Sequence, residues 1–379
     1  MGNPVDLLET LLAKTEADYI FPPLTARKLV LYGAGTLGRS VLKRLRAGGI
    51  EPVAFADDTP AKQGTVIDGL KVLPPEQIAT QFGSDFVLAV TILNSALCFL
   101  DAKKLLQQRT GHEALSLLAL ARTFPDALMP YLQYDRPAQI FENAPHIRRA
   151  FQILSDERAR EEFVAHLNFR LTARYDLLPA KSQPPYFAPG LVGKFSSDCT
   201  LVDCGAYDGD TIHQFLQHQG GRFGTIVAFE PDKRNFENLR NYVRSLGANV
   251  ASRIHLHHGA VGDHSGEAPF DDTGDMSAAV RPDATGKVKL FALDDVVRSS
   301  GSDIYVKFDI EGFELQALNG ARSLLQSQRP ALAVSAYHRP ADLWEIPLYL
   351  HDLDIGYRLA VRTEGDDGMD LVCYALPAG

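Results

Sequence analysis

A glycine-containing turn between a strand pattern and a helix pattern is the feature that most constrains this chain. The segment TLVDCGAYDGDTIHQFL begins with Thr200–Val202, an apolar run that predicts a buried strand, and Asp203 stands at its carboxyl end. Gly205 lets the backbone turn beneath a ligand, and Gly209 opens the next helix with exposed N–H groups. Because ligands of open α/β sheets lie at the carboxyl ends of strands, this turn predicts a ligand site.

An acidic residue ends the next predicted strand. Glu230 closes the segment TIVAFE, at the place where a carboxylate accepts both ribose hydroxyls of a nucleoside. The turn itself carries three carboxylates, Asp203, Asp208 and Asp210. Their negative field suits a sulfonium cation and repels a diphosphate, so the pattern favours S-adenosylmethionine (SAM) over NAD. An acidic helix start capped by Asp208 or Asp210 is the structural alternative.

The rest of the C-terminal half alternates strand patterns with helix patterns. Strands are expected at 199–203, 224–229, 254–258, 304–309, 331–336, 356–362 and 370–376, and helices near 209–219, 233–246, 313–327 and 340–352. This alternation predicts a mainly parallel, Rossmann-like α/β sheet covered on both faces. The short turn Glu364–Gly368 joins the last two strands into a terminal hairpin, as in a class I SAM-methyltransferase.

A second glycine turn lies near the start of the chain. In KLVLYGAGTLGRSVLKRL, Leu29–Tyr32 indicates a strand and Arg39–Arg46 a helix, and a second strand at Pro52–Ala56 follows. This context predicts a smaller Rossmann-like α/β domain with a nucleotide site formed by Gly33, Gly35, Gly38 and Asp57. An equally weighted alternative is a domain that keeps this fold and binds no ligand.

The length of 379 residues suits two domains better than one. Between the two glycine turns, residues 121–190 show apolar residues at helical spacing and end in a proline-rich stretch. We therefore expect an N-terminal domain at 1–120, a helical connector at 121–190 and a ligand-binding domain at 191–379.

The composition and the net charge indicate which cellular location and which binding partners are favoured. The formal net charge is −9 and the basic residues are spread along the chain, which disfavours a nucleic-acid partner. The four cysteines show no metal-ligand spacing. A long apolar run and a signal-peptide pattern are both missing, which favours a cytoplasmic protein without a membrane partner. A homo-oligomer is compatible with the sequence.

Several segments together resemble the FkbM family of SAM-dependent methyltransferases: VDCGAYDGDT, AFEPD, GAVGDHSGE, FALDDV and KFDIEGFELQALNGA. The resemblance covers residues 190–379, and Tyr186-Phe187 before it resembles the lead-in of two-domain members. The family is known for O-methylation, often of sugars or sugar-bearing natural products, which implies a small-molecule acceptor that contains a sugar. Tyr207 departs from the broader methyltransferase pattern, which commonly has a glycine there.

The resemblance also implies which residues bind the cofactor. The methionine part of SAM would lie along the glycine turn, its ribose on Glu230 and its adenine near Asp263. The implied cofactor-binding residues are Asp203, Gly205, Ala206, Tyr207, Gly209, Asp210, Thr211, Glu230, Pro231 and Asp263. Asp263 is alternatively a turn residue, and Ser277 lies in a loop that either touches the cofactor or is flexible.

Methyl transfer to a hydroxyl requires that the acceptor oxygen is positioned and loses its proton. Asp309 ends the fourth predicted strand, Glu311 follows it, and His338 ends the fifth at the same edge of the sheet. These three are the predicted catalytic residues, with Asp309 or His338 as the proton acceptor. They could also bind a divalent metal ion, a hypothesis that we do not favour because nothing in the sequence fixes their geometry.

The sequence therefore predicts a SAM-dependent methyltransferase that O-methylates a hydroxyl of a sugar or glycosylated small molecule. One alternative is an NAD(P)-dependent oxidoreductase that uses the N-terminal glycine turn. The other is a protein that binds SAM or a nucleotide without catalysis.

Overall fold

The computed structural model describes residues 3–19, 21, 24, 27–93, 97–131, 133–271, 279–280, 286–298 and 302–378. Ser277, considered above as a cofactor contact, lies outside these residues. The chain divides into two units: unit 1 consists of Met1–Ala144, Val164–Pro179 and Asp366–Gly368, and unit 2 of Pro145–Phe163, Ala180–Gly365 and Met369–Gly379.

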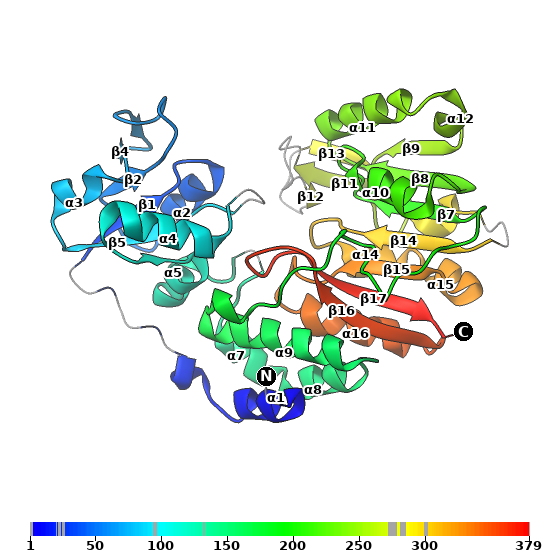
Figure 1. Ribbon diagram of the computed structural model, residues 1–379, viewed down its shortest axis with the longest axis horizontal. Helices are drawn as coiled ribbons and strands as arrows, with labels where there is room; N and C mark the ends of the chain where they lie inside the picture. The colour runs from blue at the N-terminus through cyan, green and yellow to red at the C-terminus, as the bar shows by residue number, and fades with distance from the viewer. Residues whose placement is uncertain are drawn as a thin grey trace. The chain divides into compact units, whose positions relative to one another are not determined.

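Unit 2 is built on a seven-stranded sheet (Figure 1). Its strands are β7 (Thr200–Cys204), β8 (Thr225–Glu230), β9 (Ile254–His258), β14 (Ile304–Phe308), β15 (Ala331–Ser335), β16 (Tyr357–Thr363) and β17 (Leu371–Pro377). Their order is β16-β17-β15-β14-β7-β8-β9. Strands β15, β14, β7, β8 and β9 pair in parallel, and β17 is antiparallel to both β15 and β16. The predicted parallel sheet with a terminal hairpin is confirmed.

The helices of unit 2 follow the predicted alternation with one difference. Three form at the expected places: α10 (Asp210–Gln219), α11 (Lys233–Ser245) and α16 (Asp342–Asp352). Where the sequence predicts one helix over 313–327, the structure has two, α14 (Glu314–Asn319) and α15 (Arg322–Gln328). They are separated at Gly320, where the chain packs directly against backbone: a Cβ atom here would lie 2.0 Å from the carbonyl oxygen of Gly262.

A second sheet in unit 2 is missing from the sequence prediction. Its strands are β10 (Ala260–Val261), β11 (Gly266–Asp271), β12 (Ala279–Val280) and β13 (Gly286–Phe291), in the order β10-β13-β11-β12. Strands β10 and β12 have two residues each, which is too short for an alternating pattern of polar and apolar residues. Such a pattern is present at Lys287–Leu290 in β13. The short helices α12 (Ala248–Ala251) and α13 (Leu293–Val296) flank this part of the chain.

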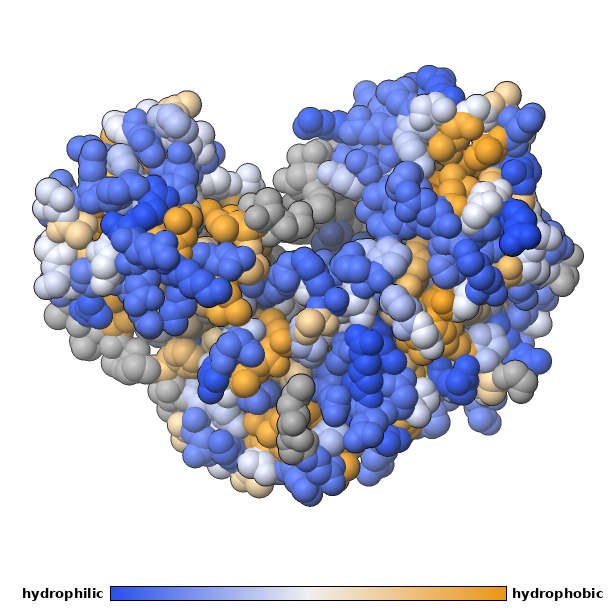
Figure 2. Space-filling view, in the orientation of Figure 1, coloured by the Kyte–Doolittle hydropathy of each residue, from blue (hydrophilic) through white to orange (hydrophobic). Residues whose placement is uncertain are grey.

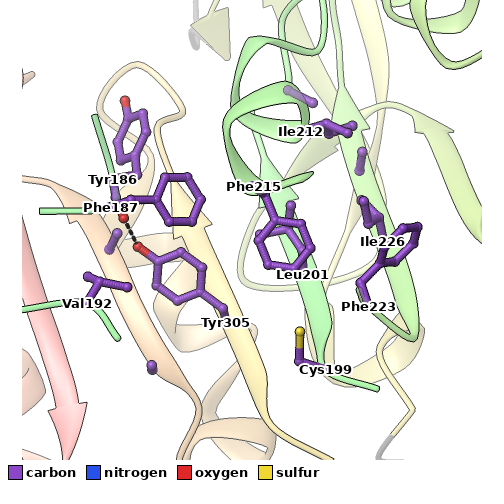
Figure 3. Packing of buried hydrophobic residues seen from close by; sticks show 14 of the residues in the cluster. Tyr186, Phe187, Val192, Cys199, Leu201, Ile212, Phe215, Phe223, Ile226 and Tyr305 are labelled. Carbon is purple, nitrogen blue, oxygen red and sulfur yellow. Dashed lines mark hydrogen bonds between the residues drawn. The ribbon is translucent and has the colours of Figure 1, made fainter. Parts of the chain in front are cut away.

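Aromatic side chains pack the segment before β7 onto the main sheet (Figure 3). The ring of Phe187 lies 5.5 Å from the ring of Tyr305 on β14 and 6.3 Å from that of Phe215 on α10. The Tyr305 hydroxyl donates a hydrogen bond to the backbone oxygen of Tyr186. This packing holds Tyr186 beside the carboxyl end of β14, which becomes important for the site below.

Unit 1 contains the predicted Rossmann-like sheet. Its strands are β1 (Lys28–Tyr32), β2 (Ala54–Ala56), β3 (Val66–Ile67), β4 (Leu70–Leu73), β5 (Phe86–Val90) and β6 (Ala114–Leu115), in the order β3-β4-β2-β1-β5-β6. All neighbours pair in parallel except β3 and β4. Helix α2 (Thr36–Ala47) begins before the predicted Arg39, because Gly38 lets the first helical turn approach the glycine loop. A Cβ atom at Gly38 would lie 1.8 Å from the oxygen of Gly33.

The remaining helices range from four residues in α6 to 16 in α9. They are α1 (Pro4–Leu12), α3 (Gln77–Phe82), α4 (Phe99–Thr110), α5 (Leu117–Thr123), α6 (Pro125–Leu128), α7 (Pro137–Glu142), α8 (Ala144–Gln152) and α9 (Glu157–Thr172), with single 3₁₀ turns at Glu16–Tyr19 and Tyr175–Leu177. Residues 121–190, expected as a connector, are shared between the two units. The α8–α9 link covers the sheet edge, since Ser155 N donates to Leu359 O on the outer strand β16 at 2.8 Å.

In the described part of the chain, no helix is long and apolar enough to cross a membrane. Hydrophilic side chains cover most of the visible face of each unit, with separate hydrophobic areas among them (Figure 2).

We expect Gly320→Ala to lower the stability of unit 2 by about 1–3 kcal/mol, because the added methyl group overlaps the backbone carbonyl of Gly262. The backbone at Gly320 is ordinary (φ −74°), so the contact and not backbone strain is responsible. Denaturant unfolding can be followed by the fluorescence of Trp344, the single tryptophan, which is buried in α16 of unit 2.

The matched control is Gly193→Ala, where no atom lies within 4 Å of the added Cβ and stability should change by less than about 0.5 kcal/mol. Equal unfolding midpoints for the two variants would contradict the packing described for Gly320.

Candidate active site

The turn after β7 requires glycine at two positions. Gly205 has φ +84°, and a Cβ atom there would lie 1.9 Å from the backbone oxygen of Asp309. Gly209 has φ +98°, and its Cβ would lie 2.4 Å from the ring of Tyr242. Tyr207 between them also has a positive φ, +47°. The chain therefore turns sharply under the carboxyl edge of the sheet, and α10 starts directly behind it, as the sequence predicts.

A buried lysine lies between two carboxylates at this edge. The Nζ of Lys307 lies 3.2 Å from Oδ1 of Asp203 and 3.9 Å from Oδ2 of Asp309, and it donates a hydrogen bond to the oxygen of Gly205. Burial alone would lower the pKa of Lys307, but the two carboxylates raise it above its ordinary value. Lys307 is therefore a cation that offsets part of the negative charge of the site.

Asp203 is fully buried at the end of β7. Although Lys307 lies close enough for an ion pair, neither side-chain oxygen of Asp203 accepts a hydrogen bond within the described residues. Burial raises the pKa of Asp203 to about 6, and the charge of Lys307 limits the rise. A buried acceptor without a donor is costly, so this carboxylate suits an ammonium or N–H group of a ligand.

Glu230 is 5% exposed at the end of β8. Its Oε2 accepts a hydrogen bond from Tyr207 N and its Oε1 one from Asp232 N, both at 2.9 Å. Burial raises the pKa of Glu230 to about 7, which the two amide donors oppose. Each carboxylate oxygen has a second lone pair, so both can still accept a hydroxyl donor such as those of a ribose.

Asp309 follows β14 and is surrounded by donors. Its Oδ2 accepts a hydrogen bond from the Tyr186 hydroxyl and its Oδ1 one from the Ser335 hydroxyl, each at 2.9 Å. Burial would raise the pKa of Asp309, but Lys307, His338 and the two hydroxyls hold it below its ordinary value. Asp309 is therefore ionised, with a side chain that is still 26% exposed.

His338 lies among three acids. Its Nδ1 donates to Oε1 of the fully buried Glu314 at 2.8 Å, and its Nε2 lies 3.4 Å from Asp309 and 3.8 Å from Glu311. Burial would lower the pKa of His338, but the acids, Glu314 foremost, raise it to about 10. His338 is therefore protonated at neutral pH in this arrangement and cannot take up a further proton.

Glu311 has the most accessible carboxylate of this group. Its side chain is 36% exposed and its backbone adopts a left-handed conformation (φ +57°). Partial burial raises the pKa of Glu311 to about 7, and the positive charge of His338 opposes that rise. A carboxylate whose pKa lies near neutral is well matched to proton transfer at neutral pH.

The other predicted cofactor residues lie around the same turn, with one exception. Thr211 is buried, its amide donates to Oδ1 of Asp210 at 2.6 Å, and Ala206 N donates to the backbone of β8. Pro231 follows Glu230 directly and is partly buried. Asp263, by contrast, has a side chain that is 53% exposed and pairs with the neighbouring His264 at 2.7 Å. This pairing suits the turn-residue alternative, and the adenine contact stays a prediction.

Sequence reasoning missed two hydroxyls that touch the catalytic cluster. Tyr186 and Ser335 both donate to Asp309, yet Tyr186 precedes it by 123 residues and Ser335 lies in an apolar strand. The resemblance pointed to Tyr186 only as part of a lead-in segment. The signal for Ser335 was a polar residue at the end of a predicted strand, at the edge where Asp309 was expected.

The N-terminal turn has the predicted shape, but its acid already has partners. Asp57 is 6% exposed and accepts hydrogen bonds from Ala34 N at 2.8 Å, Thr59 N at 2.8 Å and Lys62 Nζ at 3.0 Å. Gly33 has φ +113°, whereas Gly35 has open space around its Cβ position. The carboxylate of the predicted nucleotide site therefore stabilises its own loop, and the nucleotide site of this unit stays a prediction.

In the regions that the structure describes, no group of three or more histidine, cysteine, aspartate or glutamate side chains is arranged to hold a metal ion. Asp309, Glu311 and His338 lie close together, and the proton on His338 would have to leave before its imidazole could bind a metal ion.

The sequence and the fold both match methyltransferases. A family model described as methyltransferase FkbM domain matches residues 203–359. The crystal structure of methyltransferase FkbM from Methylobacillus flagellatus KT is 26% identical in sequence and superposes with a TM-score of 0.79, covering 98% of this chain and 100% of that one. A putative rRNA methylase from Clostridium thermocellum is 14% identical, with a TM-score of 0.33 over 49% of this chain and 90% of that chain. No curated protein sequence matches this chain.

The pKa of His338 makes a pH-dependent prediction. Because the folded protein raises this pKa from 6.5 to about 10, the stabilisation from the imidazolium is full below pH 6.5 and is lost as the pH rises through about 10. His338→Gln should therefore lower the unfolding temperature most below pH 6.5, and the difference from the unmodified protein should shrink towards pH 10.

The control is His351→Gln, which replaces an exposed histidine at the end of α16. Its difference in unfolding temperature from the unmodified protein should not shrink in this way. A difference for His338→Gln that stays constant over this range would mean that His338 is neutral in the folded protein.

Proposed function

We propose that this chain is a methyltransferase that uses SAM to methylate a hydroxyl group, a proposal supported by the match of residues 203–359 to the methyltransferase FkbM domain. The observation that carries the choice of SAM is the buried carboxylate of Asp203. Neither of its oxygens accepts a hydrogen bond from the described residues, and it lies beside a turn that requires glycine at two positions. The residues present fit the cofactor. Asp203 would hold the methionine ammonium group and Glu230 the ribose hydroxyls, with Gly205 and Gly209 leaving room along the turn.

When bound, SAM supplies a methyl group on a positively charged sulfur. The carboxylates at this edge outnumber the buried ammonium of Lys307, so the site retains a negative field that favours such a cation. Tyr186 and Ser335 hold Asp309 in one orientation through its two oxygens. Asp309 then positions the acceptor hydroxyl by accepting its hydrogen bond.

We assign proton removal to Glu311 and not to His338. Glu311 has a partly exposed carboxylate and a pKa of about 7, whereas His338 already carries its proton. The imidazolium of His338 lies within 3.4 Å of Asp309 and 3.8 Å of Glu311, so it can stabilise both carboxylates and donate a hydrogen bond at this place. Asp309, Glu311 and His338 all keep roles in transfer, but the base differs from the one expected from the sequence.

For the acceptor we propose a hydroxyl on a sugar or glycosylated small molecule, on the strength of the family resemblance alone. The N-terminal glycine turn offers little support for the oxidoreductase alternative, since Asp57 is engaged by three protein donors. The remaining alternative is a protein that binds SAM without catalysis. The methyl-transfer assay described below distinguishes it from an enzyme.

Asp203→Asn and Glu230→Gln should each weaken SAM binding by about 1–3 kcal/mol, since each removes a charge-assisted hydrogen bond. Isothermal calorimetry on the full chain with SAM, S-adenosylhomocysteine and NAD measures this directly. Glu237→Gln, on the surface of α11, is the control and should leave SAM affinity unchanged. Binding of NAD that survives Glu230→Gln, with no heat from SAM, would overturn the proposed cofactor.

Asp309→Asn should slow methyl transfer by about 10²–10⁴-fold while SAM affinity stays nearly the same, because Asp309 acts on the acceptor and not on the cofactor. Glu311→Gln should have a similar effect and should also remove the inflection near pH 7 from the rate profile. The assay follows radiolabelled methyl transfer from SAM to a panel of sugars, sugar nucleotides and glycosides. Full activity in both variants would exclude them from the mechanism.

A further inference from the structure

A pocket of about 420 Å³ opens on unit 2 beside the outer strand of the sheet. Its walls include Ser155, Asp156 and Arg158 from the start of α9, Gly190 from the segment before β7, and Arg358 and Arg362 from β16. All of these residues belong to unit 2. The pocket therefore exists within one compact unit.

The pocket is separate from the catalytic cluster. Arg362 on β16 pairs with Val372 on β17, and Val372 pairs with Ser335 on β15, which contacts Asp309. Two strand spacings, about 10 Å, thus lie between Arg362 and Ser335. None of the acids assigned above to SAM binding or methyl transfer lines the pocket.

Three arginines and one aspartate line this space, which is unusual in a chain whose net charge is −9. The side chain of Arg358 is exposed and has no ion-pair or hydrogen-bond partner within the described residues. Arg158 is held by Glu162 and by the Ser182 hydroxyl, both at 2.6 Å. The local excess of positive charge therefore comes mainly from Arg358.

Arg362 is the buried member of the set, with a side chain that is 8% exposed. Its terminal nitrogens donate to Asp156 at 3.1 Å and to the oxygen of Val361 at 2.8 Å. Its Nε has no acceptor among the residues that the structure describes. A buried guanidinium with an unused donor in the wall of a positively charged pocket is costly unless an acceptor arrives from outside the protein.

We propose that this pocket binds an oxyanion of the phosphate class, either free phosphate or the phosphate group of a small phosphate ester. Arginine forks match the oxygens of phosphate in geometry and charge, and a dianion suits a pocket with several guanidinium groups. Arg358 supplies the free fork, Arg362 adds the unused Nε donor, and Asp156 holds Arg362 in place. The site is independent of the proposed methyl transfer, so binding can be measured without SAM.

The test is isothermal calorimetry of the full chain with inorganic phosphate and, separately, with a hexose 1-phosphate. Arg358→Gln should weaken binding by about tenfold or more, because it removes a charged donor pair from the site. Arg358 makes no contact that folding needs, so the variant should unfold at the same temperature as the unmodified protein. The matched control is Arg222→Gln, which removes another exposed positive charge of unit 2 and should leave binding unchanged.

Both probes bear on the proposal. Tighter binding of the hexose phosphate supports a phosphate ester as the natural occupant, and equal binding of the two supports free phosphate. Absence of heat with both probes would overturn the site. Equal weakening in the Arg358 and Arg222 variants would do so as well, because it would reduce the effect to general electrostatic attraction.

Discussion

The site depends on one buried ammonium group between carboxylates. Lys307 brings a positive charge to the carboxyl edge of unit 2, where Asp203 and Asp309 end neighbouring strands. Placing these charges in the interior is costly, and only their mutual attraction and their hydrogen bonds offset that cost. The positive charge of Lys307 allows several acids to lie at this edge and remain ionised. Because neither oxygen of Asp203 accepts a hydrogen bond from the part of the chain that the structure describes, the same arrangement that stabilises the cluster leaves a place for a cationic ligand.

Asp309, Glu311 and His338 lie close together, but their surroundings give them different protonation states. Donors and positive charges lower the pKa of Asp309, partial burial raises that of Glu311 to about 7, and three acids raise that of His338 to about 10. Such divergence between neighbouring groups is how one site assigns positioning, proton transfer and charge stabilisation to different side chains. The assignment of Glu311 as the base follows from this separation.

The sequence was sufficient for the main sheets and for the edge that carries the site. Strand and helix periods, together with two glycine turns, predicted both parallel sheets and placed Asp203, Glu230 and Asp309 at carboxyl ends. Long-range contacts were out of reach: nothing near Asp309 in sequence indicates Tyr186, and the proton on His338 depends on the buried Glu314. The strands β10 and β12 are two residues long and show no period, so the second sheet of unit 2 was also missed.

The most direct test of the account is a crystal structure of the full chain with S-adenosylhomocysteine. The amino group of the ligand should lie within hydrogen-bond distance of Asp203, and its ribose hydroxyls should lie on the carboxylate of Glu230. A structure in which the ligand lies elsewhere, while both carboxylates contact only protein or water, would contradict it.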